Sequence, residues 1–480
     1  MALFPVISDE AYYFYWGDHF AGGYYDLSPM VGWWEAALVK VSHHPLWLRL
    51  PNLLALLCVC VGMVEWLAHQ VEKSKALRIT LLFFFSPLPF LAVMVSPDVP
   101  LLLFTFLSAY LFYQATNQAS MKAFFFSGVL WGAAFLSKYF ALMVLPAYGL
   151  WFLFVKKPRP SWLSLVVFVA GAAPFLYQHW HWNSEHCWAN FVFNLVVRQR
   201  AYEGTVFQTF GLFLVYLLAH ATPVVWRDVI RQFKVSLQNK MKNELSTFLL
   251  LMWLVPVSLF GVTALMQKGQ GLHWYFSYSP FFFLWLGLGL NLEQLQARLR
   301  WMMRFSSVLL VVVLTALSAP NFFAGWYFKN HHTFAYRLAF EGRAWVDQIW
   351  PWIQNETVIF TDNYTLSSVL NYELRHHAPG PAPEVNLWGD GSRFGRVFDW
   401  NIDFRSLEGK TIKIISTGQL RSDWAGFFKD FQVQDQGGFF ITTGTEFQAK
   451  KYRQQITIPQ VNLYYPKFFN LPDRCKIREE

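Results

Sequence analysis

Residues 123–155 read AFFFSGVLWGAAFLSKYFALMVLPAYGLWFLFV, and Ser137-Lys138 is the only polar break in this stretch. As one helix it would rise by about 1.5 Å per residue to roughly 50 Å, whereas the hydrocarbon core of a bilayer is about 30 Å thick. The stretch is therefore too long for a single membrane span. The sequence predicts two spans that turn at Ser137-Lys138.

The whole chain has the composition of an integral membrane protein. Of its 480 residues, 55% are hydrophobic and 14% are charged, and they include 49 Phe and 23 Trp. Soluble domains carry more charge and fewer aromatic residues. We expect a polytopic α-helical membrane protein with about ten spans, near residues 48–69, 77–95, 99–115, 123–137, 139–155, 161–178, 207–226, 247–266, 275–291 and 305–320.

The run from residue 77 to residue 115 is interrupted by Ser96-Pro97-Asp98-Val99-Pro100. Two prolines disfavour a continuous helix, and an ionised carboxylate in the middle of the membrane costs about 2.5 to 3.5 kcal/mol or more. We therefore expect Asp98 to lie at a membrane surface.

Basic residues predict the orientation of the bundle. They gather in alternate loops, which the positive-inside rule assigns to the cytoplasm. These residues are Lys73, Lys75, Arg78, Lys122, Lys156, Lys157, Arg159, Arg227, Arg231, Lys234, Lys240, Lys242, Arg298, Arg300 and Arg304. The net charge of +9 thus reports topology, and we expect no nucleic-acid partner. Both chain ends and the remaining loops then lie outside.

An N-terminus outside the membrane needs a segment that carries it across. Residues 1–47 contain no candidate for that segment, so we expect a preceding span to be missing from this sequence; the alternative is translocation without one. We divide the chain into an extracytoplasmic first loop that carries acids (1–47), a transmembrane helical domain (48–320) and an extracytoplasmic soluble domain (321–480).

The last part is long enough to form its own core. Residues 334–353 and 365–374 have helical patterns, residues 357–361 and 411–416 have the pattern of buried strands, and residues 378–390 have the composition of a loop. Alternating helices and strands predict a small α/β domain. Cys187 and Cys475 would be free to pair on the outer face, although two cysteines are a weak signal.

Several short motifs follow one another in a specific order. They are Asp9-Glu10-Ala11-Tyr12-Tyr13, Gly23-Tyr24-Tyr25-Asp26 with Pro29, Ser96-Pro97-Asp98-Val99-Pro100-Leu101, Gly132 with Leu136-Ser137-Lys138-Tyr139, Asn183-Ser184-Glu185 before Trp188 and Phe191, and His273-Trp274. Together they resemble the bacterial glycosyltransferases of the GT-C superfold, in the branch related to dolichyl-phosphate-mannose protein mannosyltransferases and the lipid A aminoarabinose transferase. The resemblance covers residues 9 to about 320.

This resemblance implies a multi-pass protein of the cell inner membrane that transfers a sugar on the periplasmic face. The donor would be a polyprenyl-phosphate-linked sugar, and the acceptor would be lipid A, lipopolysaccharide core, another envelope glycan or a protein. Such a reaction needs cations or a metal near the leaving phosphate, a base for the acceptor hydroxyl, and an apolar surface for the lipid chain.

The resemblance implies that Asp9 is the base. Glu10 is its neighbour in sequence, but on a helix the two side chains diverge by about 100°, so only one can face the site. Asp98 is a third catalytic candidate, with the alternative that it caps the following helix. Asp26 falls where related enzymes carry an acid that binds a divalent metal, although this chain has Leu27-Ser28 where relatives often have His-Pro; its alternative is a loop cap.

Four cationic or imidazole side chains are candidates for binding the donor phosphate or the acceptor. Lys138 is a lone cation on the outer face, which calls for a local anion such as a phosphate or else lets it reach lipid headgroups. Arg198 and Arg200 either clamp a phosphate or form a solvated loop face. His273 precedes Trp274 at a membrane boundary, where it is placed to bind phosphate or metal. Apart from a divalent metal, no cofactor is expected.

Two other classes of protein remain open at this point. A transporter or lipid flippase would place ionisable residues deep within its spans and would show internal repeats, neither of which we find. An inactive scaffold for envelope assembly is compatible with the altered Leu27-Ser28 pair. A nucleotide-driven pump is disfavoured because the chain has no phosphate-binding loop of the Walker type.

Overall fold

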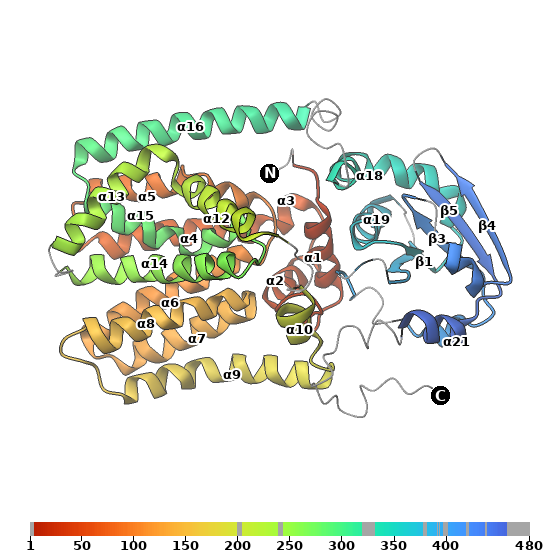
Figure 1. Cartoon of the computed structure of the whole chain (residues 1–480), viewed down its shortest axis with the longest axis horizontal. Helices are drawn as coiled ribbons and strands as arrows, with labels where there is room; N and C mark the ends of the chain where they lie inside the picture. The colour runs from red at the N-terminus through yellow and green to blue at the C-terminus, as the bar shows by residue number, and fades with distance from the viewer. Residues whose placement is uncertain are drawn as a thin grey trace.

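The computed structural model describes residues 4–198, 204–238, 243–318, 332–377, 382–390, 392, 394–396, 402–418, 422–436 and 439–457. It consists of a long helical bundle and a smaller α/β domain, with a layer of short helices between them (Figure 1). We call the end of the bundle that carries this layer the site end, and the opposite end the basic end.

The ten predicted apolar stretches are helical over most of their described lengths. They contain α4 (Leu50–Leu67), α5 (Lys73–Phe84), η1 (Leu88–Val93), α6 (Asp98–Gln118), α7 (Met121–Ser137), η2 (Tyr139–Val144), α8 (Leu145–Leu150), η3 (Trp151–Val155), α9 (Leu163–Glu185), α12 (Val206–Ala221), α13 (Pro223–Gln238), α14 (Glu244–Leu265), η5 (Leu272–Tyr278), α15 (Ser279–Leu288) and α16 (Leu292–Ser318). The predicted mostly helical architecture with several long apolar helices is therefore confirmed.

The number of spans stays a prediction. Five helices in the described part of the chain are long and apolar enough to cross a membrane, and a sixth span is reached if α12 and α13, which meet at 92°, count together. The helices over residues 121–137 and 139–155 are apolar but shorter. As predicted, α7 ends at Ser137 and a new helical segment begins at Tyr139, directly after Lys138.

Close packing in the bundle depends on glycine where α7 crosses α9. A Cβ atom at Gly128 would lie 1.9 Å from the carbonyl oxygen of Phe168, and one at Gly171 would lie 2.2 Å from that of Phe125. No larger residue fits without moving a helix backbone. Small residues at such crossings let membrane helices approach closely, because lipid supplies no hydrophobic force between them.

Ion pairs join the helix ends at the basic end. Lys156 Nζ lies 2.7 Å from Glu244 Oε2, and Arg298 Nε lies 2.5 Å from Asp228 Oδ2. These pairs connect the end of η3 with the start of α14, and α13 with α16. Residues that the charge pattern assigns to one side of the membrane thus lie close together in space.

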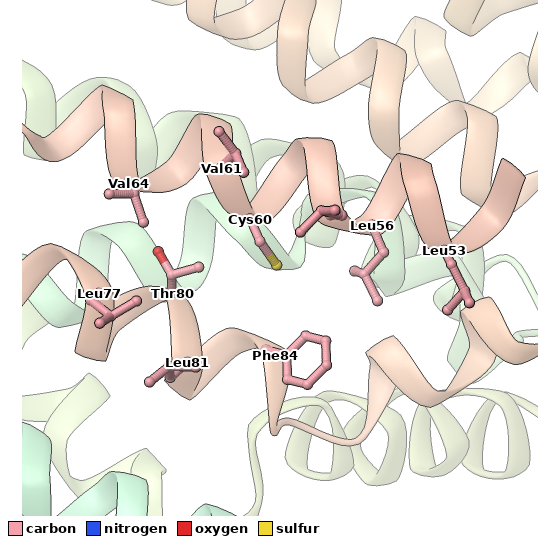
Figure 2. A pocket seen from close by; sticks show the side chains of 10 residues that line it. Leu53, Leu56, Cys60, Val61, Val64, Leu77, Thr80, Leu81 and Phe84 are labelled. Atoms are coloured by element: carbon pink, nitrogen blue, oxygen red, sulfur yellow. The ribbon is translucent and has the colours of Figure 1, made fainter. Parts of the chain in front are cut away.

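An open apolar groove runs between α4 and α5, with a volume of about 340 Å³ (Figure 2). Its lining consists of Leu53, Leu56, Leu57, Cys60, Val61, Val64, Leu77, Thr80, Leu81 and Phe84. The hydroxyl of Thr80 donates to the carbonyl oxygen of Ala76, so the groove presents almost no polar surface. Such a surface suits a hydrocarbon chain.

The layer at the site end is made by α1 (Ser8–Asp18), α2 (Met30–Leu38), α3 (Pro45–Leu48), α10 (Ala189–Val192) and η4 (Phe193–Val197) (Figure 1). Its core is aromatic: Trp16 stacks on Tyr24 at 4.1 Å between ring centroids, and Tyr25 packs on Phe193 at 4.9 Å. The first loop is thus a folded layer, packed on one side against the bundle and on the other against the α/β domain.

A buried ion pair attaches α1 to the bundle. Arg49, at the start of α4, donates from Nε to Glu10 Oε1 at 2.7 Å and from Nη2 to Glu10 Oε2 at 2.5 Å, and both side chains are fully buried. Glu10 Oε1 also accepts from the backbone N–H of Val95 at 2.9 Å. The pair therefore joins α1, α4 and the segment that leads to Asp98.

The α/β domain contains five strands. They are β1 (Val358–Thr361), β2 (Glu384–Leu387), β3 (Ile412–Ser416), β4 (Asp430–Asp435) and β5 (Phe440–Thr445), in the order β2-β1-β3-β5-β4. β1 pairs in parallel with β2 and β3, with Ile359 opposite Val385 and Phe360 opposite Ile414, and the other pairs are antiparallel.

Two larger helices, α18 (His332–Ile353) and α19 (Tyr364–His377), pack together over one face of the sheet. Four short helices complete the described part of the domain: η6 (Phe404–Leu407), η7 (Ser422–Phe427), α21 (Ala449–Tyr452) and η8 (Arg453–Thr457).

The sequence predicted most of the helices and strands of the α/β domain correctly, but not all of them. The helices at 334–353 and 365–374 and the strands at 357–361 and 411–416 are confirmed by α18, α19, β1 and β3. The loop predicted at 378–390 is wrong over β2, because Glu384–Leu387 adds to β1 as an edge strand. An edge strand tolerates a flanking proline, and Pro383 precedes this one. The predicted boundary at residue 320 lies outside the described residues.

The Glu10–Arg49 pair predicts a specific pattern of stability. Arg49→Met leaves the Glu10 carboxylate buried without its partner, which costs about 3 to 5 kcal/mol. Replacing both residues by Met removes the stranded charge, so the double variant should be more stable than the single one. Thermal unfolding of the detergent-solubilised protein measures this, and a single variant that melts with the wild type would contradict it.

Candidate active site

Helix α1 turns the two acids of the first loop to different sides, as their 100° separation predicts. Glu10 is fully buried, and both of its carboxylate oxygens are bound by Arg49. Asp9 is exposed. Glu10 was a catalytic candidate, but the structure gives it no access to a substrate. Its contacts assign it to holding α1, and with it Asp9, in place.

Asp9 accepts one hydrogen bond, from the hydroxyl of Tyr364 to Oδ1 at 2.9 Å. The dense protein around the carboxylate raises the pKa of Asp9 above its ordinary value, while the Tyr364 hydrogen bond and the positive charge of Arg198 lower it by smaller amounts. A carboxylate whose pKa is moved towards neutrality is a better proton acceptor near pH 7. Asp9 is therefore accessible to a substrate, and its role as the base stays a prediction.

Asp26 lies on the loop between α1 and α2 and is buried. Its Oδ2 accepts from the backbone N–H of Gly395 at 3.0 Å. Burial raises the pKa of Asp26 to about 7, with smaller lowering effects from Gly395, the Tyr12 hydroxyl and Arg198 and a raising effect from Asp9. Near neutral pH this carboxyl group therefore exists in both protonation states.

Asp98 begins α6 and forms a buried ion pair with Lys138, with Nζ and Oδ1 2.8 Å apart. Asp98 is at the end of a span, as predicted, but it is covered by protein rather than exposed at a surface. The anion next to Lys138 is thus this carboxylate, where we expected a phosphate or a lipid headgroup. The pair connects the start of α6 with the end of α7.

His273 lies in η5, near the same pair. Burial lowers the pKa of His273 to about 4, while the charge of Asp98 raises it and those of Lys138 and Arg198 lower it. The imidazole is therefore neutral at pH 7, so that it can hydrogen-bond a substrate but adds no positive charge.

Arg198 follows η4, and its positive charge acts on several titratable groups of the site. Its charge acts on Asp9, Asp26, Lys138 and His273. Among the described residues no carboxylate forms an ion pair with it. Arg198 is therefore the cation of this site that has capacity for an anionic ligand. Arg200, the other predicted arginine, lies outside the described residues.

Two asparagines that the sequence analysis missed support this part of the site. Asn190 Nδ2 donates to the carbonyl oxygen of Tyr24 at 2.7 Å, and Asn194 Nδ2 donates to that of Asp26 at 2.9 Å. Asn190, Asn194 and Arg198 are spaced by four residues, which places them on one face of a helix. The four-residue spacing is the sequence feature that could have identified these asparagines as part of the site. The asparagines fix the Asp26 loop against the helical segment that carries Arg198.

A divalent metal at this site stays a prediction. Across the part of the chain that the structure describes, no group of three or more His, Cys, Asp or Glu side chains is placed to hold an ion. Asp26 is the residue we expected to bind one, and its Oδ2 is occupied by the Gly395 N–H. We derive no chemical step through a metal. Cys187 is disulfide-bonded, and Cys475 lies outside the described residues.

The arrangement can be compared with known proteins. Residues 26–182 match the family model described as Dolichyl-phosphate-mannose-protein mannosyltransferase. The lipid A galacturonosyltransferase RgtD of Rhizobium johnstonii is 27% identical over 185 residues, which span 37% of this chain and 38% of RgtD. The crystal structure of ArnT from Cupriavidus metallidurans bound to undecaprenyl phosphate superposes with a TM-score of 0.63 and 14% identity, covering 92% of this chain and 95% of ArnT.

Part of the chain thus matches a mannosyltransferase family, and nearly all of it shares the fold of ArnT. The apo form of the same ArnT gives a TM-score of 0.60 at 13% identity, over 92% of this chain and 94% of ArnT, so the shared fold extends over the bundle and the α/β domain. The family match contains Asp26, Asp98 and Lys138, whereas Asp9, Arg198 and His273 lie outside residues 26–182. The roles of all six residues stay predictions.

The raised pKa of Asp26 predicts how stability depends on pH. Because its carboxyl group has a pKa of about 7 in the folded protein and an ordinary value near 3.8 when unfolded, the wild type loses stability as pH rises from about 4 to 7. Each pKa unit of such a shift corresponds to about 1.4 kcal/mol. Asp26→Asn stays neutral and keeps an oxygen for the Gly395 N–H.

The thermal midpoint of Asp26→Asn should therefore exceed that of the wild type at pH 8, and the difference should shrink as the pH falls to 5. A difference that is the same at both pH values would show that Asp26 is not destabilised by ionisation.

Proposed function

We propose that this protein transfers a sugar from a polyprenyl-phosphate donor to an acceptor hydroxyl or phosphate of the cell envelope, on the periplasmic face of the inner membrane. The observation that carries the proposal is the gathering of Asp9, Asp98, Lys138 and Arg198 at one end of an apolar helical bundle, with Asp9 exposed and Arg198 in no ion pair with any described residue. RgtD, named as a lipid A galacturonosyltransferase, supports lipid A as the first acceptor to test.

In the proposed reaction the acceptor oxygen forms a new bond to the anomeric carbon of the sugar while the bond from that carbon to the donor phosphate oxygen breaks. Asp9 takes the proton of the acceptor hydroxyl, and polyprenyl phosphate leaves. A positioned carboxylate typically accelerates such a step by 10² to 10⁴. The proposed sugar is a hexose or pentose derivative.

The leaving phosphate gains negative charge as the bond breaks. Arg198 provides a planar guanidinium with several donors, which matches phosphate geometry. Lys138 already faces Asp98, so its charge is partly neutralised before a substrate arrives. We therefore assign the main stabilisation of the leaving group to Arg198, with His273 as a neutral hydrogen-bonding partner.

The donor also carries a long hydrocarbon chain, which must remain in an apolar environment. The bundle has such an environment close to the site. The groove between α4 and α5 includes Leu53, one helical turn after Arg49, whose partner Glu10 is adjacent to Asp9 (Figure 2). A lipid substrate can thus have its chain in the membrane and its phosphate at the site end.

Asp9→Asn tests the proposal. Membranes of a strain that lacks this protein would be compared with those of strains that express the wild type or the variant, by mass spectrometry of envelope lipids and glycans. The wild type should add one sugar mass to one class of lipid or glycan. The variant should lower that product at least about 100-fold while inserting normally, because the acceptor proton has no base.

Glu185→Gln is the matched control, since Glu185 is an exposed carboxylate at the site end of α9 whose ion-pair partner among the described residues is the partly exposed His181. It should keep wild-type activity. Full activity of Asp9→Asn would remove Asp9 from the mechanism, and identical envelope spectra with and without the protein would overturn the proposed transfer itself.

A further inference from the structure

The α/β domain lies directly on the helix that carries Asp9. Helix α19 lies beside α1 (Figure 1). Tyr364 contacts Asp9, the ring of Tyr372 lies 5.8 Å from that of Phe14, and Arg375 is ion-paired with Asp18. Contacts at the first, middle and last turns of α1 fix the register of the two helices. The two parts of the chain therefore meet in one defined alignment.

The same domain reaches the second acid of the first loop. The backbone N–H of Gly395 donates to Asp26, and Phe394 packs with its ring 5.7 Å from that of Tyr364 and 5.5 Å from that of Phe193. Tyr364 in turn packs 6.2 Å from Tyr12. Asp9 and Asp26 thus each accept a hydrogen bond from a residue more than 350 positions later in the chain.

We infer that Tyr364 is a positioning residue for Asp9, and that the α/β domain thereby completes the active site instead of only covering it. The inference rests on the proposed function, because it assigns Tyr364 a task in the transfer reaction. Tyr364 acts through Asp9 and needs no contact with the substrate.

One oxygen of the Asp9 carboxylate is held by a hydrogen bond from a described residue and the other is not. The Tyr364 hydroxyl occupies Oδ1, and the described residues offer no hydrogen bond to Oδ2, which is left for the acceptor proton. A hydrogen bond donated to the ionised carboxylate also stabilises that form over the protonated one. The other titratable or charged groups that act electrostatically with Asp9 are Arg198, Asp26 and Tyr13, and none of them is held to it by a hydrogen bond.

Tyr364→Phe tests this inference because it removes the hydroxyl and keeps the ring. The purified full-length protein would be added to membranes from a strain that lacks it, which contain the native donor and acceptor, and the initial transfer rate would be measured from pH 5 to pH 9. Without the hydroxyl the Asp9 carboxylate loses its stabilising donor, so the acid limb of the rate profile should move up by about one pH unit. On that limb the transfer rate of Tyr364→Phe should be about tenfold lower than that of the wild type, and it should return to the wild-type rate at higher pH.

Tyr372→Phe is the matched control, because it removes a hydroxyl from the same helix against the same α1, two turns away from Asp9. It should leave the acid limb in place. A lower amount of folded protein would reduce the rate at every pH without moving the midpoint of the limb, so the readout separates positioning from stability.

An unmoved limb in Tyr364→Phe, or an equal movement in Tyr372→Phe, would overturn the inference. Failure of the proposed function gives a different result, since the wild type would then produce no sugar transfer in the same membranes at any pH. If the wild type is active and Tyr364→Phe matches it at all pH values, transfer stands and the role of Tyr364 does not.

Discussion

The position of Asp9 depends on the buried ion pair between Glu10 and Arg49. Two charges without access to water are costly unless each is fully paired, and here the guanidinium engages both carboxylate oxygens while Val95 supplies a further N–H. The pair connects α1 with α4 and with the segment before Asp98. Glu10 thus holds α1 against the bundle, and this fixes the position of its neighbour Asp9.

The three remaining carboxylates differ because their surroundings differ. Asp98 is neutralised by Lys138, Asp26 is buried with a backbone donor, and Asp9 is exposed beside a tyrosine hydroxyl. Different surroundings of this kind are how carboxylates at one site can take different roles. The charge of Arg198 acts on both Asp9 and Asp26, which is why we propose it as the residue that binds an anionic substrate group.

The sequence predicted what depends on local patterns. Apolar stretches, the turn at Lys138, the proline break before Asp98 and the main elements of the α/β domain follow from hydropathy and periodicity over ten to twenty residues. It could not predict that Glu10 binds Arg49, that the anion beside Lys138 is Asp98, or that Tyr364 and Gly395 reach the first loop. Those contacts join residues far apart in the chain, and no local pattern records them. Strand β2 was missed because its flanking prolines and glycine resemble a loop.

The central claim is that the site end faces away from the cytoplasm, where a polyprenyl-phosphate donor would meet an envelope acceptor. Single cysteines at Phe20, beside α1, and at Lys157, at the basic end, can test it in a protein whose Cys58 and Cys60 are replaced by alanine; both positions are exposed. In spheroplasts, a membrane-impermeant maleimide should label Phe20→Cys directly and Lys157→Cys only after the membrane is permeabilised. Labelling in the reverse order would place Asp9 in the cytoplasm and contradict the account.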